Sequence, residues 1–163
     1  MKVKAYVLAG AVVLLYISAA SKDVRYRGIT PGDLAPGIKY SGNGKDFVIP
    51  DHSNRYTLLN FWASYDANSR ARNVRLANEV NKLDEDKIAL CSVSFDESPS
   101  VFSGTVRIDK LNQATQFNEP GGKNSGLYRR YGLKKGFTNF LIDENGIIVA
   151  KDIDPKELAG LID

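Results

Sequence analysis

Residues 61–70 read FWASYDANSR, and they join two segments of different periodicity. Residues 56–61 (YTLLNF) form a short apolar run with aromatic and β-branched side chains, which indicates a buried strand. From residue 67 to about residue 83, apolar or small side chains recur at intervals of three or four, which is typical of a helix with one face on a core. Residues 61–70 are therefore predicted to form the junction between a buried strand and a helix.

The predicted helix after this junction is amphipathic. Its apolar or small side chains, at one spacing of four and then several of three, are Ala67, Ala71, Val74, Ala77, Val80 and Leu83. Charged side chains, among them Arg70 and Arg72, fall on the other faces. The pattern therefore predicts a core face that contains no charged residue.

Further elements follow on both sides of the junction. In chain order they are a weak hairpin at 37–50, a second buried strand at 87–95, a helix that begins near Ser98 and Pro99, a short helix at 126–131, a hairpin of strands 137–142 and 147–151, and a closing helix at 155–162. The first two strands flank a helix, which favours a parallel pair with a right-handed crossover. The sequence thus predicts an α/β fold with a mixed central sheet flanked by helices on both faces.

Residues 1–20 have the pattern of a secretory signal peptide. Two lysines precede an apolar run, and the small residues Ser18, Ala19 and Ala20 follow it, which predicts cleavage after Ala20. An uncleaved membrane anchor is the alternative, although the apolar run is shorter than a membrane span. No cysteine follows the run, so bacterial lipoprotein-type lipid attachment is excluded. Residues 21–31 are predicted to be a linker, and residues 32–163 the folded domain.

Composition excludes several classes of function. The chain has 22 basic and 19 acidic side chains and no basic block, so we expect no nucleic-acid partner. A single histidine, His52, lies in a turn-like segment without a spaced carboxylate cluster, so no metal site and no cofactor are expected. One cysteine, Cys91, rules out an internal disulfide. Stability must therefore come from packing.

Five pieces of the sequence together resemble one family. They are GDLAP at 32–36, LLNFWAS at 58–64, Arg70 after this motif, VSFDE at 93–97 and TNFLIDENGIIV at 138–149. In this order and spacing they resemble thioredoxin-fold proteins of the exported TlpA/ResA-like type, which are thiol–disulfide oxidoreductases related to the AhpC/TSA peroxiredoxins. The resemblance implies a thioredoxin-like fold for residues 32–163. It also implies an exported protein, periplasmic or envelope-associated, in a Gram-negative bacterium.

The chain departs from this family where the family carries its chemistry. The family pattern is FWASWCxPCR, and here Tyr65 stands for the second Trp, Asp66 for the first Cys, Asn68 for the Pro and Ser69 for the second Cys. Phe137 stands where the family places a cis-proline. Cis peptide bonds belong almost wholly to proline, so the bond before Phe137 is expected to be trans.

These departures predict that thiol chemistry is absent. Exchange needs a thiolate that attacks and a second sulfur that resolves, and Asp66 and Ser69 supply neither. Cys91 lies in an apolar strand, where a thiol is usually an inert small hydrophobic group. The sequence favours a redox-inactive domain that binds a protein or peptide, or acts as a scaffold, rather than an enzyme. The alternatives are a thiol oxidoreductase or peroxidase that uses Cys91, and a structural subunit held to the membrane by the N-terminal segment.

The candidate binding surface consists of Trp62, Tyr65, Asp66 and Phe137, which the family fold brings together. Asp66 is expected to cap the helix, with Ser69 satisfying another terminal group. The alternative is that Asp66 meets a cationic side chain of a partner or a metal. For Trp62 and Phe137 the alternative is that both pack inward. The basic pairs at 129–130 and 134–135 are either a solvated face or a surface that steers an acidic partner.

Overall fold

A computed structural model of the chain describes residues 26–162 except 43, 44, 52 and 54. The predicted signal peptide, the first half of the predicted linker and His52 lie outside the described residues. The helices and strands are β1 (Ile38–Gly42), β2 (Lys45–Ile49), β3 (Tyr56–Trp62), α1 (Ala67–Val80), β4 (Ile88–Ser94), α2 (Pro99–Ile108), β5 (Gln116–Asn118), α3 (Gly126–Arg130), β6 (Asn139–Ile142), β7 (Ile148–Lys151) and α4 (Ala159–Ile162). Among these described helices, none has both the length and the apolarity needed to cross a bilayer.

The central sheet has five strands in the order β5-β4-β3-β6-β7. β4 pairs in parallel with β3, from Tyr56 opposite Ile88 to Trp62 opposite Ser94, and β5 pairs in parallel with β4. β6 and β7 are antiparallel neighbours at the other side of β3. The mixed sheet and its parallel first pair confirm the prediction. β5 was not predicted, because three residues are too few to show a period of two.

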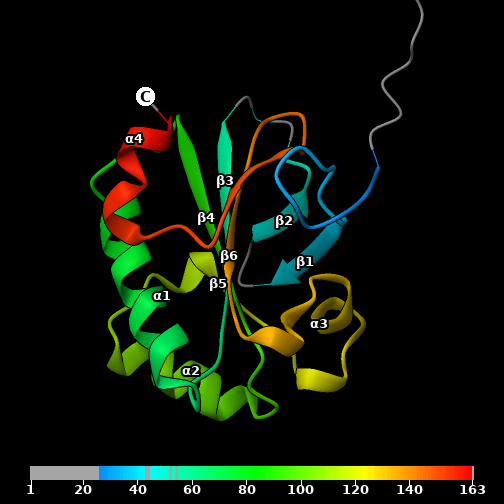
Figure 1. Cartoon of the computed structure of the whole chain (residues 1–163). Helices are drawn as coiled ribbons and strands as arrows, with labels where there is room; N and C mark the ends of the chain where they lie inside the picture. Colours follow the sequence, from blue (N-terminus) through cyan, green and yellow to red (C-terminus); the bar gives the residue numbers. More distant parts are fainter. Residues whose placement is uncertain (1–25, 43–44, 52, 54, 163) are drawn as a thin grey trace, which may run out of the picture.

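Two layers cover the sheet, one on each face (Figure 1). α1 and α4 lie on one face, where Leu76 and Ile162 pack in a core cluster with Leu58 of β3. The β1–β2 hairpin and α3 lie on the other face, where the next residue of β3, Leu59, packs with Leu127. The alternation of strand side chains separates the two cores.

One predicted helix differs from the structure in extent. The predicted closing helix at 155–162 is divided into a 3-10 turn at Pro155–Glu157 and the short helix α4, with Asp154 as the cap of the turn. The described part of the predicted linker, residues 26–31, runs along the domain. There Gly28 N donates to Leu34 O at 3.1 Å, and Leu34 forms a β-bridge with Ile147.

The predicted core face of α1 is partly wrong. Ala67 and Ala71 are exposed, whereas Ser69 and Asn73 are buried together with Leu76 and Ala77. A face with two polar residues can be buried here because the sheet beneath it offers hydrogen-bond partners. Helical spacing alone favoured the small apolar residues and gave no sign of those partners.

Asn73 is the centre of this buried polar network. Its Oδ1 accepts from Asn60 Nδ2 at 3.0 Å and from Ser92 Oγ at 2.5 Å, and its Nδ2 donates to Gln116 Oε1 at 3.0 Å. Asn60, Ser92 and Gln116 belong to β3, β4 and β5. One helix residue therefore connects three neighbouring strands and fixes α1 across the sheet.

Candidate functional site

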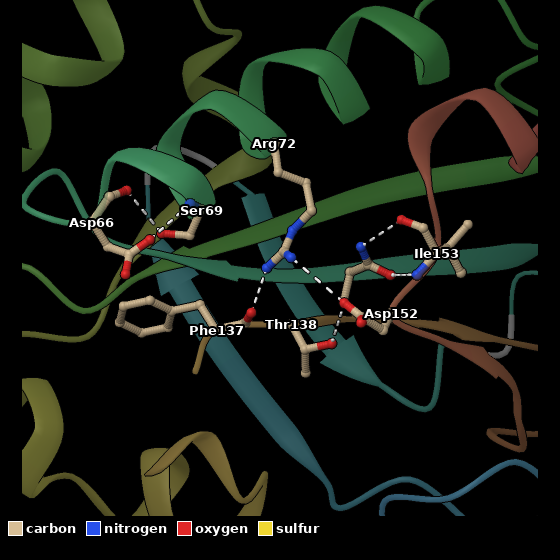
Figure 2. Close-up of polar contacts among 8 residues, drawn as sticks. Asp66, Ser69, Arg72, Phe137, Thr138, Asp152 and Ile153 are labelled. Carbon is tan, nitrogen blue, oxygen red and sulfur yellow. Dashed lines mark hydrogen bonds and ion pairs between the residues drawn. The ribbon is translucent and has the colours of Figure 1, made fainter. Parts of the chain in front are cut away.

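The junction between β3 and α1 places Asp66 at the helix N-cap. Asp66 has an extended backbone, with φ −107° and ψ 99°, and its Oδ1 accepts the N–H of Ser69 at 2.8 Å. A carboxylate in this position satisfies one of the N–H groups that have no partner at a helix start, and it favours the positive end of the helix dipole. The predicted capping role of Asp66 is confirmed (Figure 2).

Ser69 completes the same helix start from inside the protein. Its side chain is buried, its hydroxyl donates to the carbonyl of Asp66 at 3.2 Å, and it accepts the N–H of Ala63 at 3.3 Å. Asp66 and Ser69 both lie at the start of α1, and both side chains form hydrogen bonds with nearby backbone groups. Ser69 is therefore closed to an external reactant.

A second helix residue, Arg72, holds the loop that faces Asp66. In Figure 2 its guanidinium extends from α1 to this loop, where Nη2 donates to the carbonyl of Phe137 at 2.5 Å. Its Nη1 lies 3.5 Å from Oδ1 of Asp152, which also accepts from Thr138 Oγ1 at 3.3 Å. Arg72 thus connects α1, the loop before β6 and the turn after β7.

Sequence analysis missed this role of Arg72. Its charge and its place in the helical pattern marked it as a residue outside the core face, yet its side chain is only 19% exposed. Burial lowers the pKa of its guanidinium, and the nearby carboxylate of Asp152 opposes that effect. The helical spacing could not predict this contact of Arg72, because the acceptor is a backbone carbonyl 65 residues further along the chain.

Phe137 packs partly inward. Its ring stacks on Phe95 at a centroid distance of 5.7 Å and makes a T-shaped contact with the ring of Tyr128 at a centroid distance of 6.2 Å. The bond before Phe137 is not among the cis peptides of the described residues, as expected. Tyr65 lies beside it with a centroid distance of 6.3 Å, and 57% of Tyr65 is exposed. The structure therefore brings Tyr65, Asp66 and Phe137 to one place.

Trp62 does not belong to this surface, so that part of the predicted binding surface is wrong. It is fully buried and packs against Phe102 of α2 at a centroid distance of 6.3 Å. Because side chains alternate along a strand, Trp62 shares the face of Leu58 and Asn60, which α1 covers. Of the two readings left open by the sequence, inward packing holds for Trp62.

Asp96, which the sequence analysis did not select, fixes the backbone before Tyr65. It is nearly buried at the end of β4, where it accepts from Ser64 N at 3.0 Å, Ser64 Oγ at 2.7 Å and Ser94 Oγ at 2.7 Å. Partial burial, followed by the charge of Asp96, raises the pKa of the Tyr65 hydroxyl. An acidic residue directly after a buried strand was the available signal.

A shallow depression lies on the other side of Tyr65. Ser64, Glu97, Val101 and Lys123 line it together with Tyr65, and Lys123 Nζ lies 5.3 Å from the centroid of the Tyr65 ring. This distance allows a cation–π contact. Tyr65 is thus an exposed ring held between a helix start and a basic side chain.

Cys91 lies away from this site, in the middle of β4. It is completely buried in the core cluster beneath the β1–β2 hairpin, and burial raises the pKa of its thiol well above the ordinary value. Such an environment disfavours the thiolate, which is the nucleophilic form. Within the described residues, no group of three or more His, Cys, Asp or Glu side chains is placed to hold a metal ion.

No protein-family model matches the chain, and no curated protein matches it. Solved structures do. A thioredoxin-like protein from Parabacteroides distasonis is 53% identical, with a TM-score of 0.76 over 84% of this chain and 97% of its own. A thiol-disulfide oxidoreductase from Bacteroides fragilis is 28% identical, with a TM-score of 0.64 over 78% and 96%. StoA from Bacillus subtilis is 20% identical, with a TM-score of 0.61 over 74% and 90%.

The fold and the similarity to the Parabacteroides structure define the class. The chain belongs to the thioredoxin-like proteins, as the sequence motifs predicted, and it has the fold of thiol-disulfide oxidoreductases. This fold supplies the strand–helix junction at which Asp66 and Ser69 lie.

Proposed function

We propose that this protein is a redox-inactive thioredoxin-like domain that binds a protein or peptide without a covalent step, in the bacterial cell envelope. The observation that carries the proposal is the position and the hydrogen bonding of Asp66 and Ser69. They occupy the two positions of the family's reactive cysteines, and both side chains are used to close the start of α1. Neither side chain can attack or resolve a disulfide.

The environment of Cys91 supports the absence of redox chemistry. Thiol exchange requires a thiolate with access to its substrate, and Cys91 has neither the ionisation nor the exposure. A peroxidase that uses this cysteine alone has the same two requirements. The alternative function through Cys91 therefore has no support from its surroundings.

The surface formed by Tyr65, Asp66 and Phe137 supports binding. An exposed tyrosine beside a half-buried phenylalanine offers the rigid aromatic area that is enriched at the centre of protein interfaces. Among the described residues, the backbone N–H of Phe137 has no hydrogen-bond partner, so it can pair with the main chain of a bound segment. Arg72 holds the carbonyl of the same residue and so keeps this N–H in a fixed position.

Reduction of insulin by dithiothreitol tests the redox half of the proposal. We expect the wild-type protein to give no turnover above the uncatalysed rate, and the thiol of Cys91 to react with a labelling reagent only in denaturant. Turnover above that rate which disappears in Cys91→Ser, together with rapid labelling of the folded protein near neutral pH, would establish the alternative enzyme instead.

Affinity capture from the native envelope tests the binding half. We expect Tyr65→Ala and Phe137→Ala to lose proteins that the wild type retains. Tyr65→Ala is the more informative variant, because an exposed ring can be removed without opening the core. Tyr26→Ala is the matched control, since Tyr26 is also exposed but lies on the N-terminal segment next to Leu34. An unchanged set of partners in both site variants would remove this surface from the proposal.

Export rests on the signal-peptide pattern of residues 1–20. We expect the protein in the periplasmic or envelope fraction, and mass spectrometry of a cleaved chain to give Ser21 as the first residue. An intact N-terminus in the membrane fraction would replace cleavage with the uncleaved anchor. Recovery in the cytoplasm would reject export.

A further inference from the structure

Residues 123–135 form a basic segment. It contains five of the chain's 22 basic side chains and none of its 19 acidic ones. The five basic residues are Lys123, Arg129, Arg130, Lys134 and Lys135. The nearest acidic residues in the sequence are Glu119 before the segment and Asp143 after it. Positive charge is thus concentrated in the connection between β5 and β6.

The five basic side chains of this segment are exposed, and none forms an ion pair with a described residue. Arg55, Arg70, Arg72 and Lys82, by contrast, each form an ion pair with a described carboxylate. Arg129 contacts only a neutral group, the carbonyl of Asn124, at 2.6 Å. Arg129, Arg130, Lys134 and Lys135 lie in the last turns of α3 and of the following 3-10 helix, where the helix end favours positive charge. Like charges in one segment also repel one another, and no described acidic side chain pairs with them.

The basic segment begins and ends at the Tyr65–Phe137 surface. Lys123 Nζ lies over the ring of Tyr65, and Lys135 is separated from Phe137 only by Gly136. Between these ends, Leu127 and Tyr128 are buried, and Tyr128 contacts the ring of Phe137. The segment is therefore fixed to the core by its apolar residues, and its two end lysines lie next to the aromatic pair, Lys123 in space and Lys135 in sequence.

We propose that the occupant of this surface is a protein segment in which an apolar or aromatic residue is flanked by aspartate or glutamate; this proposal rests on the function proposed above. The rings of Tyr65 and Phe137 receive the apolar residue, and the basic segment receives the carboxylates. Arginine presents a planar fork that binds a carboxylate with two hydrogen bonds, and lysine contributes charge over a wider range of positions.

Acidic groups near Tyr65 do not cancel this preference. Asp66 and Asp96 already accept hydrogen bonds within the chain, from Ser69 and from two serines respectively. Glu97 is exposed and has no partner among the described residues, so its charge opposes an acidic occupant. Neutralising Glu97 is therefore expected to strengthen binding of an acidic occupant, whereas neutralising the lysines of the basic segment is expected to weaken it.

Fluorescence anisotropy with three labelled peptides tests the charge preference. The first has a central phenylalanine flanked by Asp and Glu, and in the others Gln or Lys replaces the acidic residues. We expect the acidic peptide to bind about tenfold more tightly than the lysine peptide, because complementary charges favour one partner over the other. The difference should shrink as salt is added. Equal binding of all three peptides would overturn the proposal.

Two double variants locate the effect. Lys134→Gln/Lys135→Gln should weaken binding of the acidic peptide about fivefold, the sum of two modest exposed charge contacts, and leave the glutamine peptide unchanged. Lys110→Gln/Lys156→Gln removes the same charge from exposed positions outside the basic segment and should change neither. Glu97→Gln should strengthen binding of the acidic peptide. Equal losses in the two double variants would assign the effect to net charge and reject the site.

The outcomes separate this proposal from the function beneath it. If capture of partners depends on Tyr65 but not on Lys134 and Lys135, the binding function stands and the acidic occupant is rejected. If capture depends neither on Tyr65 nor on Lys134 and Lys135, both the binding function and the acidic occupant are rejected. Vesicles that contain phosphatidylglycerol are the remaining arm, because they present negative charge without a peptide. Binding to these vesicles in the absence of binding to the acidic peptide would replace the protein occupant with a membrane surface.

Discussion

Asp66 keeps a structural role at a position where the family pattern has a reactive cysteine. In the family, a cysteine at this helix start is favoured as a thiolate by the helix dipole and the free N–H groups. Asp66 places a carboxyl group there, and its Oδ1 accepts the N–H of Ser69 at an N···O distance of 2.8 Å. The electrostatic requirement of the helix start is met without sulfur.

Removal of this cap is predicted to destabilise the domain. Asp66→Ala should lower the free energy of unfolding by about 1 kcal/mol, since Ser69 N–H then has no side-chain acceptor. Asp66→Asn, which keeps an acceptor oxygen, should cost much less. Urea denaturation of the three proteins measures the difference. Equal stability of the alanine and asparagine variants would mean that capping contributes nothing here.

Cys91 is predicted to make the stability of the domain vary with pH in the alkaline range. Its pKa is raised in the folded state, so the thiol stays protonated there while the unfolded chain ionises above the ordinary value of 9.0. The stabilisation it contributes is therefore complete below that pH and is lost as the pH rises toward the folded pKa. The stability difference between wild type and Cys91→Ala should narrow above about pH 9, as judged by urea titrations across this range. A constant difference would contradict the burial of the thiol.

At the scale of elements, α1 is held by two polar anchors in addition to its apolar contacts. Asn73 connects it to three strands of the sheet, and Arg72 connects it to the loop before β6. Both residues lie on the same helix, one directly after the other. The loop that carries Phe137 is thus positioned from α1 rather than only from its own strand.

Arg72→Lys is predicted to loosen this loop. A single ammonium group cannot keep the geometry in which one guanidinium meets both Phe137 O and Asp152, so the free energy of unfolding should fall by about 2 kcal/mol. Hydrogen exchange at residues 137–139 should become faster by more than the global loss explains. Arg75→Lys, at an exposed position of α1, is the control and should be nearly neutral. Equal exchange in both variants would remove Arg72 from loop positioning.

At the scale of the whole molecule, the thioredoxin-like architecture is present although the two cysteines of the family motif are replaced. The sheet order, the helix after β3 and the covering layers are present without a cysteine at residues 66 or 69. A fold does not by itself imply a function, because the reactive atoms belong to a few side chains placed on it. The proposed absence of redox chemistry is therefore expected to depend on residues 66 and 69 and not on the scaffold.

The double variant Asp66→Cys/Ser69→Cys tests this expectation. It is predicted to form an intramolecular disulfide in oxidising buffer, because the positions have the spacing of the family motif at a helix start, where a thiol is activated. Protection from alkylation and a small gain of insulin reduction over wild type are the measurements. Cys91→Ser in the same background controls for the native thiol. Two thiols that remain free in oxidising buffer would show that the scaffold has also diverged.

Local features of the site were predictable from the sequence. Capping by Asp66 follows from the residue type and its place before a helical pattern, and Ser98 and Pro99 mark the start of α2 in the same way. The burial of Cys91 follows in the same way from its place in an apolar strand. Such inferences succeed because their causes lie within a few residues along the chain.

The sequence by itself determined the fold class, the strand–helix junction and the absence of cysteine at its reactive positions, since these depend on local pattern and residue identity. The tertiary structure decided which side chains share a space. It buried Trp62 and Asn73, brought Arg72 to the carbonyl of Phe137, and placed Lys123 over Tyr65. These contacts join residues far apart in the chain. At these positions, hydrogen bonds or ring contacts with other elements decide which side chains are buried, and helical spacing does not. Periodicity cannot encode a partner that lies on another element.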